Sequence, residues 1–390
     1  MKPETFCSLP WINLSTDVNG SLRPCCKFAQ PDPLNEYQLP NMKEGSLDIL
    51  WNDIRFQNLR QAFLEGKKPR ECQCCWDEEA AGISSFRKEF AKHRNINLNT
   101  IKFTPIATNG PMAMDLKLNN VCNLKCRICG PQASSTFLKE YQEIFNIKVE
   151  DGEYWLSNKI LGTANEEVIR KWAKDIVHLE ITGGEPMASP ENIKVLQLLI
   201  EEDRSQYITL LLNTNGTLYN KKFIDVILKF KQVIFNISID DIDNRLEYER
   251  YPTDWNLIES NIIKFLKVRE SNKNFVIYLC PTVSMFNVYY LPEYLNWAKS
   301  KKLPWYFNIL HYPPNHSIKN LPNEIKDIVA ERLTTSEFTS VKNFLLLPSE
   351  SDIFIEEFIR LNEERDVIRR QDFHETFGEW AALLNRYRSK

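Results

Sequence analysis

Three cysteines near the middle of the chain are spaced so that they could hold one metal centre. Cys122, Cys126 and Cys129 form a C-x3-C-x2-C motif. Three thiolates on a four-iron cluster leave one iron open to a further ligand. A zinc site would more often include a fourth Cys or His close by, and the first histidine after the motif is His178. The spacing therefore favours an iron–sulfur cluster, with zinc as the alternative.

A second set of cysteines could form a closed metal site. It comprises Cys7, Cys25, Cys72 and Cys75. Four thiolates are enough to saturate a 4Fe–4S cluster, and a four-thiolate zinc site is the alternative. Asn19-Gly20 lies between the first two cysteines and predicts a hairpin that would bring them together. Cys26 and Cys74 could each replace an adjacent ligand, or could pack as small apolar side chains.

The elements that would position these cysteines alternate between strands and helices. Six strands are predicted at 112–118, 176–182, 207–213, 233–240, 275–283 and 305–310. Helical stretches are predicted between them, at 132–145, 166–174, 192–203, 221–230, 255–270 and 292–300. Before this region, one helix is expected over 51–64. Strands separated by helices imply a parallel sheet, curved or closed into a barrel, with its chemistry at the C-terminal strand ends.

Polar motifs follow the predicted strands at that end of the sheet. The second strand ends in Thr182-Gly183-Gly184-Glu185-Pro186, the third is followed by Asn213-Thr214-Asn215-Gly216, and the fourth by Ser238-Ile239-Asp240. Glycines let a backbone approach a ligand closely, and a glutamate can accept from an ammonium group. An ordinary turn or a loop cap would explain each motif taken alone. Their order on successive strands favours a shared ligand site.

The cysteine loop and these motifs together resemble the radical S-adenosylmethionine (SAM) superfamily. That resemblance implies an α/β fold, a partial (β/α)6 barrel, in which Cys122, Cys126 and Cys129 hold a 4Fe–4S cluster and SAM chelates its open iron. It implies contacts to SAM from Ile128, Gly183, Gly184, Glu185, Pro186, Asn213, Asn215, Ser238, Asp240 and Val283. The family usually has an aromatic residue where this chain has Ile128, and an aliphatic side chain can also pack against adenine.

The N-terminal cysteines resemble the auxiliary-cluster domain of the twitch and SPASM type. The pattern runs from Cys7 through Gly20-x4-Cys25 to Cys72-x2-Cys75 and implies a second 4Fe–4S cluster. Such domains usually follow the barrel, whereas here the module precedes it. We expect three parts, namely the auxiliary domain at 1–95, the radical SAM barrel at 110–312 and a helical C-terminal extension at 320–390.

Several other residues have both a chemical and a structural interpretation. Cys280 could return a hydrogen atom to a substrate radical, as in some radical SAM epimerases, or could be a buried structural cysteine. His311, Tyr312 and His316 could touch substrate at the barrel mouth or pack in a loop. A polar stretch after the fourth strand could also touch substrate or lie in a solvated loop. A solvated loop is expected for its residues Asp241, Asp243, Glu249 and Arg250.

The resemblance predicts an enzyme that reductively cleaves SAM and abstracts a hydrogen atom from a substrate. A peptide or protein substrate is expected, with a sugar or small alcohol as the alternative, and a flavodoxin or ferredoxin as electron donor. A zinc-stabilised binding or scaffold protein is the rival of another class. The basic stretch from Lys88 to Arg94 could bind nucleic acid, but a solvated helix face explains these charges more simply.

Composition is consistent with this interpretation. The net charge of −3 gives no overall attraction to nucleic acid or anionic membranes. No apolar run approaches the roughly 20 residues of a membrane helix, and the chain starts without the apolar stretch of a secretory signal. Clustered cysteines are typical of metal or redox chemistry in a reducing compartment. A cytoplasmic location without a membrane partner is therefore expected.

Overall fold

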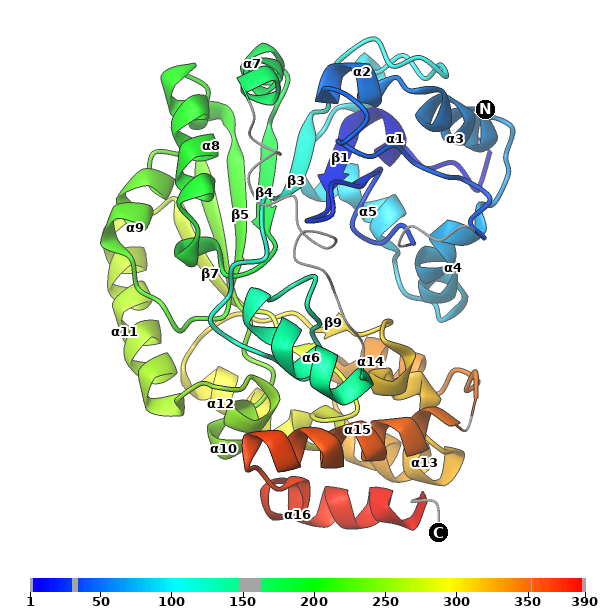
Figure 1. The fold of residues 1–390 in the computed structure, drawn as a ribbon, viewed down its shortest axis with the longest axis vertical. Coiled ribbons are helices and arrows are strands. Elements are labelled where there is room, and N and C mark those ends of the chain that lie inside the picture. The colour runs from blue at the N-terminus through cyan, green and yellow to red at the C-terminus, as the bar shows by residue number, and fades with distance from the viewer. Residues whose placement is uncertain (1–2, 30–33, 147–162, 352, 388–390) are drawn as a thin grey trace.

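The fold is built on one open, mostly parallel sheet (Figure 1). The computed structural model describes residues 3–29, 34–146, 163–351 and 353–387. The main sheet has the order β2-β1-β3-β4-β5-β6-β7. Its strands are β1 (Asn13–Thr16), β2 (Leu22–Arg23), β3 (Ala113–Lys117), β4 (His178–Thr182), β5 (Thr209–Thr214), β6 (Gln232–Ile237) and β7 (Phe275–Leu279). All neighbours from β1 to β7 are parallel, and only β2 runs antiparallel. The predicted α/β class is confirmed, and the described strands do not close into a barrel.

The last two predicted strands are shorter than expected. The fifth is interrupted at Cys280-Pro281, which divides it into β7 and the short β8 (Thr282–Val283). Proline has no N–H to donate to a ladder, so a continuous strand cannot run through it. The sixth is reduced to β9 (Asn308–Ile309), which pairs with β8 in a separate two-stranded sheet.

The N-terminal module joins the main sheet through its hairpin. β1 and β2 turn through Gly20, whose φ of 84° is in the left-handed region that favours glycine. β1 then lies beside β3 in parallel register, with Leu14 opposite Met114. The module's helices are α1 (Leu9–Ile12), α2 (Leu47–Trp51), α3 (Ile54–Leu64), α4 (Gln73–Ala80) and α5 (Phe86–His93). The helix expected over 51–64 is confirmed as α3, but it begins three residues later than expected, because Asp53 caps it by accepting from the Arg55 N–H.

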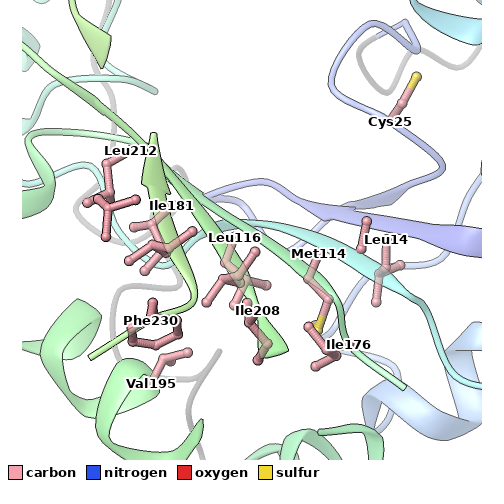
Figure 2. Close-up of a cluster of buried hydrophobic side chains, with 14 of the residues drawn as sticks. Leu14, Cys25, Met114, Leu116, Ile176, Ile181, Val195, Ile208, Leu212 and Phe230 are labelled. Carbon is pink, nitrogen blue, oxygen red and sulfur yellow. The ribbon is translucent and has the colours of Figure 1, made fainter. Parts of the chain in front are cut away.

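Helices cover one face of the sheet, and apolar side chains fill the space between them (Figures 1 and 2). These helices are α7 (Thr163–Trp172), α8 (Pro190–Glu201), α9 (Lys221–Ile227), α10 (Asp243–Glu249), α11 (Trp255–Ser271) and α12 (Leu291–Ser300). The helix α6 (Leu138–Phe145) lies apart from this layer, in contact with residues 353–369. Leu14, Met114 and Leu116 point to this face from β1 and β3, and Val195 meets them from α8. Alternate residues along each strand point to the opposite face of the sheet. Side chains at the same register position of neighbouring strands therefore lie side by side on that face.

The opposite face of the sheet carries polar groups in register. Asp115, Glu180 and Leu211 lie side by side on β3, β4 and β5. Two residues further along, Asn213 on β5 is paired with Asn236 on β6. Because parallel strands share one direction, these side chains form a polar wall that leads to the C-terminal strand ends.

The C-terminal part forms a second apolar core. It contains α13 (Asn323–Arg332), α14 (Thr339–Leu345), α15 (Ile353–Arg369) and α16 (Phe373–Leu384). Trp380 on α16 is fully buried and donates from its indole N–H to the carbonyl of Met285, at 2.8 Å. No helix in the described part of the chain is both long and apolar enough to span a bilayer.

Candidate functional site

The loop that carries Cys122, Cys126 and Cys129 follows β3 at the C-terminal end of the sheet. The Gly183-Gly184 turn after β4 presses against its backbone. A Cβ on Gly184 would lie 2.0 Å from the carbonyl oxygen of Val121, and a Cβ on Gly183 would lie 2.6 Å from that of Asn119. The two glycines therefore let the turn approach the cysteine loop, a local role that the sequence did not reveal.

Glu185 fastens the same turn to the end of β5. Its buried carboxylate accepts from the Asn215 N–H and from the Thr214 hydroxyl, both at 2.8 Å, and from the Met187 N–H at 3.2 Å. Burial raises the pKa of Glu185, although these three donors oppose the shift. Pro186, the next residue, is also buried.

Asn215 connects this region to the cysteine loop. Its side-chain amide donates to Asn123 Oδ1 at 3.0 Å and lies 3.9 Å from the Cys122 sulfur. The Leu124 N–H points to the same sulfur at 3.5 Å. Hydrogen bonds to a thiolate stabilise its negative charge, but burial outweighs them and raises the pKa of Cys122 to about 12, so a bound cationic group would be needed to hold the thiolate form.

Arg250 approaches the second cysteine of the loop. Its guanidinium lies 3.9 Å from the Cys126 sulfur and pairs with Asp240 at 2.7 Å. The Asp240 carboxylate also accepts from the Thr282 N–H at 2.8 Å. The Asp240 carboxylate is thus bound by Arg250 and by the Thr282 N–H. The contact to SAM that the resemblance implies for Asp240 stays a prediction.

The expectation of a solvated loop after the fourth strand is wrong for three of its four residues. Asp241, Glu249 and Arg250 are buried, while Asp243 is exposed. A short helix, α10, folds this segment back onto the cysteine loop, and the Arg127 N–H donates to the carbonyl of Glu249 at 2.7 Å. Tertiary packing therefore buries charges that looked like surface groups.

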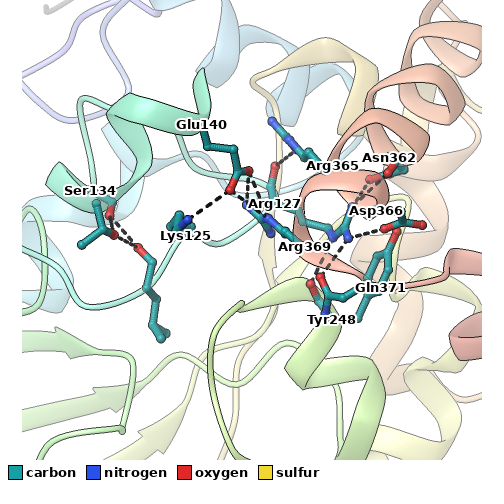
Figure 3. Close-up of polar contacts among 12 residues, drawn as sticks. Lys125, Arg127, Ser134, Glu140, Tyr248, Asn362, Arg365, Asp366, Arg369 and Gln371 are labelled. Carbon is teal, nitrogen blue, oxygen red and sulfur yellow. Dashed lines mark hydrogen bonds and ion pairs between the residues drawn. The ribbon is translucent and has the colours of Figure 1, made fainter. Parts of the chain in front are cut away.

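The cysteine loop is also braced by the C-terminal helix α15 (Figure 3). Arg127, which lies between the second and third cysteines, is fully buried and pairs with Asp366. Arg365 donates to the carbonyl of Arg127 at 2.7 Å, and Arg369 pairs with Glu140 of α6 at 2.6 Å. The loop is thus held from both sides by charged hydrogen bonds.

The polar wall described above contains an ion pair that links two parts of the chain. Arg94, at the end of α5, lies 3.5 Å from Glu180 of β4, and both side chains are largely buried. Burial and the neighbouring Asp115 raise the pKa of Glu180 to about 7, although Arg94 and Lys117 oppose this shift. The expectation that residues 88–94 form a solvated helix face is therefore wrong for Arg94.

Amide and hydroxyl groups extend the wall toward Cys280. Asn236 donates to Asn213 Oδ1 at 3.0 Å and to the Tyr306 hydroxyl at 2.9 Å. The Ser238 hydroxyl lies 3.5 Å from the Cys280 sulfur. Cys280 is buried, and burial raises its pKa to about 11. These predicted site residues thus lie in one connected polar network.

The remaining predicted residues lie in other surroundings. Val283 is fully buried in the second apolar core. A cavity of about 380 Å³ beside the cysteine loop is lined by Ile128, Cys129, Tyr312 and His316, among others. His316 is buried and contacts the side chain of Asn315, whereas Tyr312 is 73 % exposed.

The four N-terminal cysteines converge on one small cavity. Cys7, Cys25, Cys72 and Cys75 line it, together with the apolar Leu9, Phe28 and Phe86 and the cationic Lys27 and Arg87. Burial raises the pKa of the Cys7 thiol to about 12. Burial first, and then the neighbouring thiols, raise the pKa of Cys25. A bound cationic centre would offset that cost, so the donor set fits a metal group. Cys26 and Cys74 are not in the cavity lining.

One group of possible metal ligands lies apart from these cysteine sites. The ligand atoms of Cys74, Glu78 and His311 all lie within 4.8 Å of one another. His178, the histidine considered as a fourth zinc ligand, is buried in β4 opposite Ala113, at the start of β3.

The sequence analysis did not identify Arg127 and Glu180, which support the site, and it expected Arg94 and Arg250 to lie in solvated segments. One signal was present: Asp115 and Glu180 each lie in the middle of a strand, between two apolar neighbours. Polar residues at matching places on successive parallel strands predict a shared polar surface. The arginines gave no such signal, because their partners are distant in sequence.

Comparison with protein families agrees with this geometry. Residues 116–284 match the radical SAM superfamily, and residues 7–76 match the SPASM iron–sulfur cluster-binding domain. The chain therefore carries a radical SAM domain, and an iron–sulfur cluster-binding domain precedes it in the sequence. Proteins of this class are enzymes whose cofactors are SAM and iron–sulfur clusters. Comparison with curated protein sequences found no match.

Solved structures of radical SAM enzymes resemble the chain in part. Native anSMEcpe with bound AdoMet has 16 % identity and a TM-score of 0.38, covering 67 % of this chain and 62 % of that one. Streptococcus suis SuiB bound to the precursor peptide SuiA has 16 % identity and a TM-score of 0.37, covering 79 % and 65 %. The chain thus spans about three fifths of the length of anSMEcpe.

Proposed function

We propose that this chain reductively cleaves SAM to a 5′-deoxyadenosyl radical that abstracts a hydrogen atom from a substrate. The observation that carries the proposal is the convergence of three separate motifs at the C-terminal strand ends. The cysteine loop after β3, the Gly183-Gly184 turn after β4 and Asn215 after β5 are joined by direct contacts. A 4Fe–4S cluster bound there would supply the electron and an open iron for SAM.

The chain's own residues would hold and tune that centre. Cys122, Cys126 and Cys129 are the proposed cluster ligands, and Arg250 would place positive charge beside Cys126. The cavity beside Ile128 supports the proposal that the adenosyl part of SAM packs there. Gly183, Gly184, Glu185 and Pro186 are proposed contacts for the SAM amino group, and the other expected contacts, at Asn213, Asn215, Ser238, Asp240 and Val283, are proposed with them.

We propose a second 4Fe–4S cluster in the N-terminal module, held by the four cysteines that line its cavity. Cys72 and Cys75 lie at the N-terminal end of helix α4, where the helix dipole favours thiolates. Lys27 and Arg87 add positive charge at the cavity wall. The proposed division of the chain is 1–95 for this module, 110–312 for the radical SAM part and 320–390 for the C-terminal extension.

A peptide or protein is the proposed substrate. The polar wall offers amide and hydroxyl groups, and the buried Oδ1 of Asn236 has no hydrogen-bond partner among the described residues. Such an acceptor suits a backbone N–H. A sugar or small alcohol would use the same groups through its hydroxyls, and the experiment below distinguishes the two. A reduced flavodoxin or ferredoxin is the proposed electron donor.

We propose Cys280 as the group that returns a hydrogen atom to the substrate radical. Its thiol lies in the polar network, beside the Ser238 hydroxyl. For the Cys280→Ala variant in deuterated solvent, we expect product that lacks the solvent label at the reacting carbon. Unchanged labelling would contradict this role and leave Cys280 as a packing residue.

Anaerobic reconstitution with iron and sulfide tests the main proposal. We expect about eight irons per chain, as two 4Fe–4S clusters require, and 5′-deoxyadenosine on addition of dithionite and SAM. Cys126→Ala should lose about four irons and all 5′-deoxyadenosine, whereas the control Cys26→Ala should keep both. Wild-type protein with a full iron content and no 5′-deoxyadenosine would refute SAM cleavage. Deuterium transfer from labelled peptides, compared with labelled sugars, then identifies the substrate class.

A further inference from the structure

A third group of possible metal ligands lies outside both proposed iron–sulfur sites. The Cys74 thiol, the Glu78 carboxylate and the His311 imidazole each offer one ligand atom, and these atoms all lie within 4.8 Å of one another. Cys74 and Glu78 are four residues apart on α4, so they share one face of the helix. His311 reaches them from the segment that follows β9.

Two of these side chains have ligand atoms that the protein leaves unsatisfied. Glu78 is 8 % exposed, and its buried Oε2 has no hydrogen-bond partner among the described residues. The Nε2 of His311 also lacks a hydrogen-bond partner there and lies 3.6 Å from Glu78 Oε1. Buried polar atoms without partners are costly, so an additional group between them would stabilise the fold.

The surroundings hold two of the three side chains in place. Lys27 pairs with Oε1 of Glu78 and leaves Oε2 available. The ring of Phe344 packs edge-on against His311, with the ring centres 4.8 Å apart. Oriented ligands with partners of their own are a feature of metal sites, because they reduce the reorganisation that binding requires.

The ligand types of Cys74, Glu78 and His311 indicate which metal ion would bind. One thiolate, one imidazole and one carboxylate combine soft and hard donors, and zinc binds all three types in tetrahedral sites. Counting the thiolate, the carboxylate and the Lys27 ammonium leaves one net negative charge, which a divalent cation would more than neutralise. We propose that Cys74, Glu78 and His311 bind one zinc ion, with a fourth position open to water.

Such an ion would fasten the N-terminal module to the rest of the chain. Other contacts already join α4 to the C-terminal part, since Lys319 pairs with Asp77 at 3.5 Å and Asn343 donates to the carbonyl of Ala81 at 3.5 Å. A zinc bridge from α4 to His311 would strengthen this junction beside the cavity lined by Cys72 and Cys75. The proposal needs no iron–sulfur cluster, so it can fail without affecting the proposed SAM chemistry.

Zinc binding by the reconstituted protein is the test. Zinc is added after iron and sulfide have filled the cysteine sites, and the metal content and zinc affinity are measured. We expect one zinc per chain, and an X-ray absorption spectrum at the zinc edge that shows one sulfur among nitrogen and oxygen ligands. A spectrum with three or four sulfurs would place the zinc in a cysteine site and overturn the proposal, as would failure to bind zinc.

Variants assign the ligands. His311→Ala and Glu78→Gln should each weaken zinc binding at least about tenfold without changing the iron content. The control is His93→Ala, because His93 also lies beside a carboxylate, with Glu89 at 3.2 Å, but has no third ligand among the described residues. Equal zinc affinity in His311→Ala and the control would refute the site. Loss of iron in Cys74→Ser would also refute it, because Cys74 would then be a cluster ligand.

Discussion

Single residues in this protein adjust charge beside the proposed clusters. Arg250 is the clearest case, since it lies 3.9 Å from the Cys126 sulfur and pairs with the buried Asp240. Neighbouring charge and hydrogen bonds to sulfur are among the factors that set the potential of an iron–sulfur cluster. Arg250 would therefore stabilise the reduced, more negative state of a cluster bound at Cys126.

Replacing Arg250 should make the proposed catalytic cluster harder to reduce. In Arg250→Met the guanidinium is lost and the negative charge of Asp240 is left uncompensated, so we expect the potential to fall by roughly 50 mV. An EPR-monitored redox titration measures this. Arg245→Met is the control, because Arg245 pairs with Asp241 and Glu293 away from the sulfurs. Equal potentials in the two variants would contradict the role of Arg250.

Glu180 should give the fold a distinctive dependence on pH. Its pKa of about 7 is above that of an unfolded glutamate, about 4.3. Between these values the folded chain binds more protons than the unfolded chain, so stability falls as pH rises, by at most about 1.4 kcal/mol per pH unit. The contribution is fully present at low pH and is lost above about pH 7.

Thermal melts measure this effect between pH 5.5 and 8, roughly the range in which Glu180 titrates and the clusters survive. We expect the Glu180→Gln variant to show a shallower decline of Tm with pH than the wild-type protein. Asp241, with a pKa raised by burial to about 6, would account for part of the remaining slope. Glu202→Gln, a change at an exposed helix end, should leave the slope unchanged. Parallel wild-type and Glu180→Gln curves would contradict the assignment.

At the scale of elements, helix α15 supports the cysteine loop from the far end of the sequence. Arg365 and Arg369 bond to the Arg127 carbonyl and to Glu140, and Asp366 pairs with Arg127 (Figure 3). These bonds join residues more than 200 positions apart. The predicted C-terminal extension is therefore part of the cluster-binding structure rather than an appendage.

Removing the buried arginine of the loop should release the catalytic iron. Arg127→Met leaves Asp366 without its buried partner, which costs about 3–5 kcal/mol. We expect a lower Tm and the loss of about four irons. The control Arg360→Met removes an exposed pair with Glu364 on the same helix, which should cost less than about 1 kcal/mol. Full iron content in Arg127→Met would show that α15 is dispensable for the cluster.

At the scale of the molecule, the N-terminal module and the radical SAM part share one sheet. β1 pairs with β3, and Leu14 lies in the same apolar core as Met114 and Leu212 (Figure 2). The Arg94–Glu180 pair crosses the same junction. The two sequence families therefore meet within one hydrophobic core, and the module cannot unfold without exposing the edge of β3.

A core substitution in the module should thus destabilise the whole chain. Leu14 is fully buried, so Leu14→Ala should lower the free energy of unfolding by about 2–5 kcal/mol. Hydrogen exchange should show the amides of β1 and β3 losing protection together. Leu34→Ala is the control, because Leu34 is 79 % exposed. Early exchange of β1 with β3 still protected would indicate two independent units.

Much of the local structure was readable from the sequence. The alternation of strands and helices predicted the α/β class, and the cysteine pattern predicted a set of four thiols that the structure brings to one cavity, namely Cys7, Cys25, Cys72 and Cys75. The Asn19-Gly20 turn correctly predicted the β1–β2 hairpin. These features depend on neighbouring residues, whose geometry follows from backbone preferences and side-chain period.

Only the tertiary structure decided how the site is supported. It placed β1 beside β3, buried Arg127 against α15, and set Arg250 and Asp240 beside Cys126. It also separated the thiols that line the module cavity from Cys74, which faces Glu78 and His311 instead. The physical reason is that a buried charge is stable only beside a partner, and these partners are brought together by packing of distant segments, which no local sequence pattern encodes.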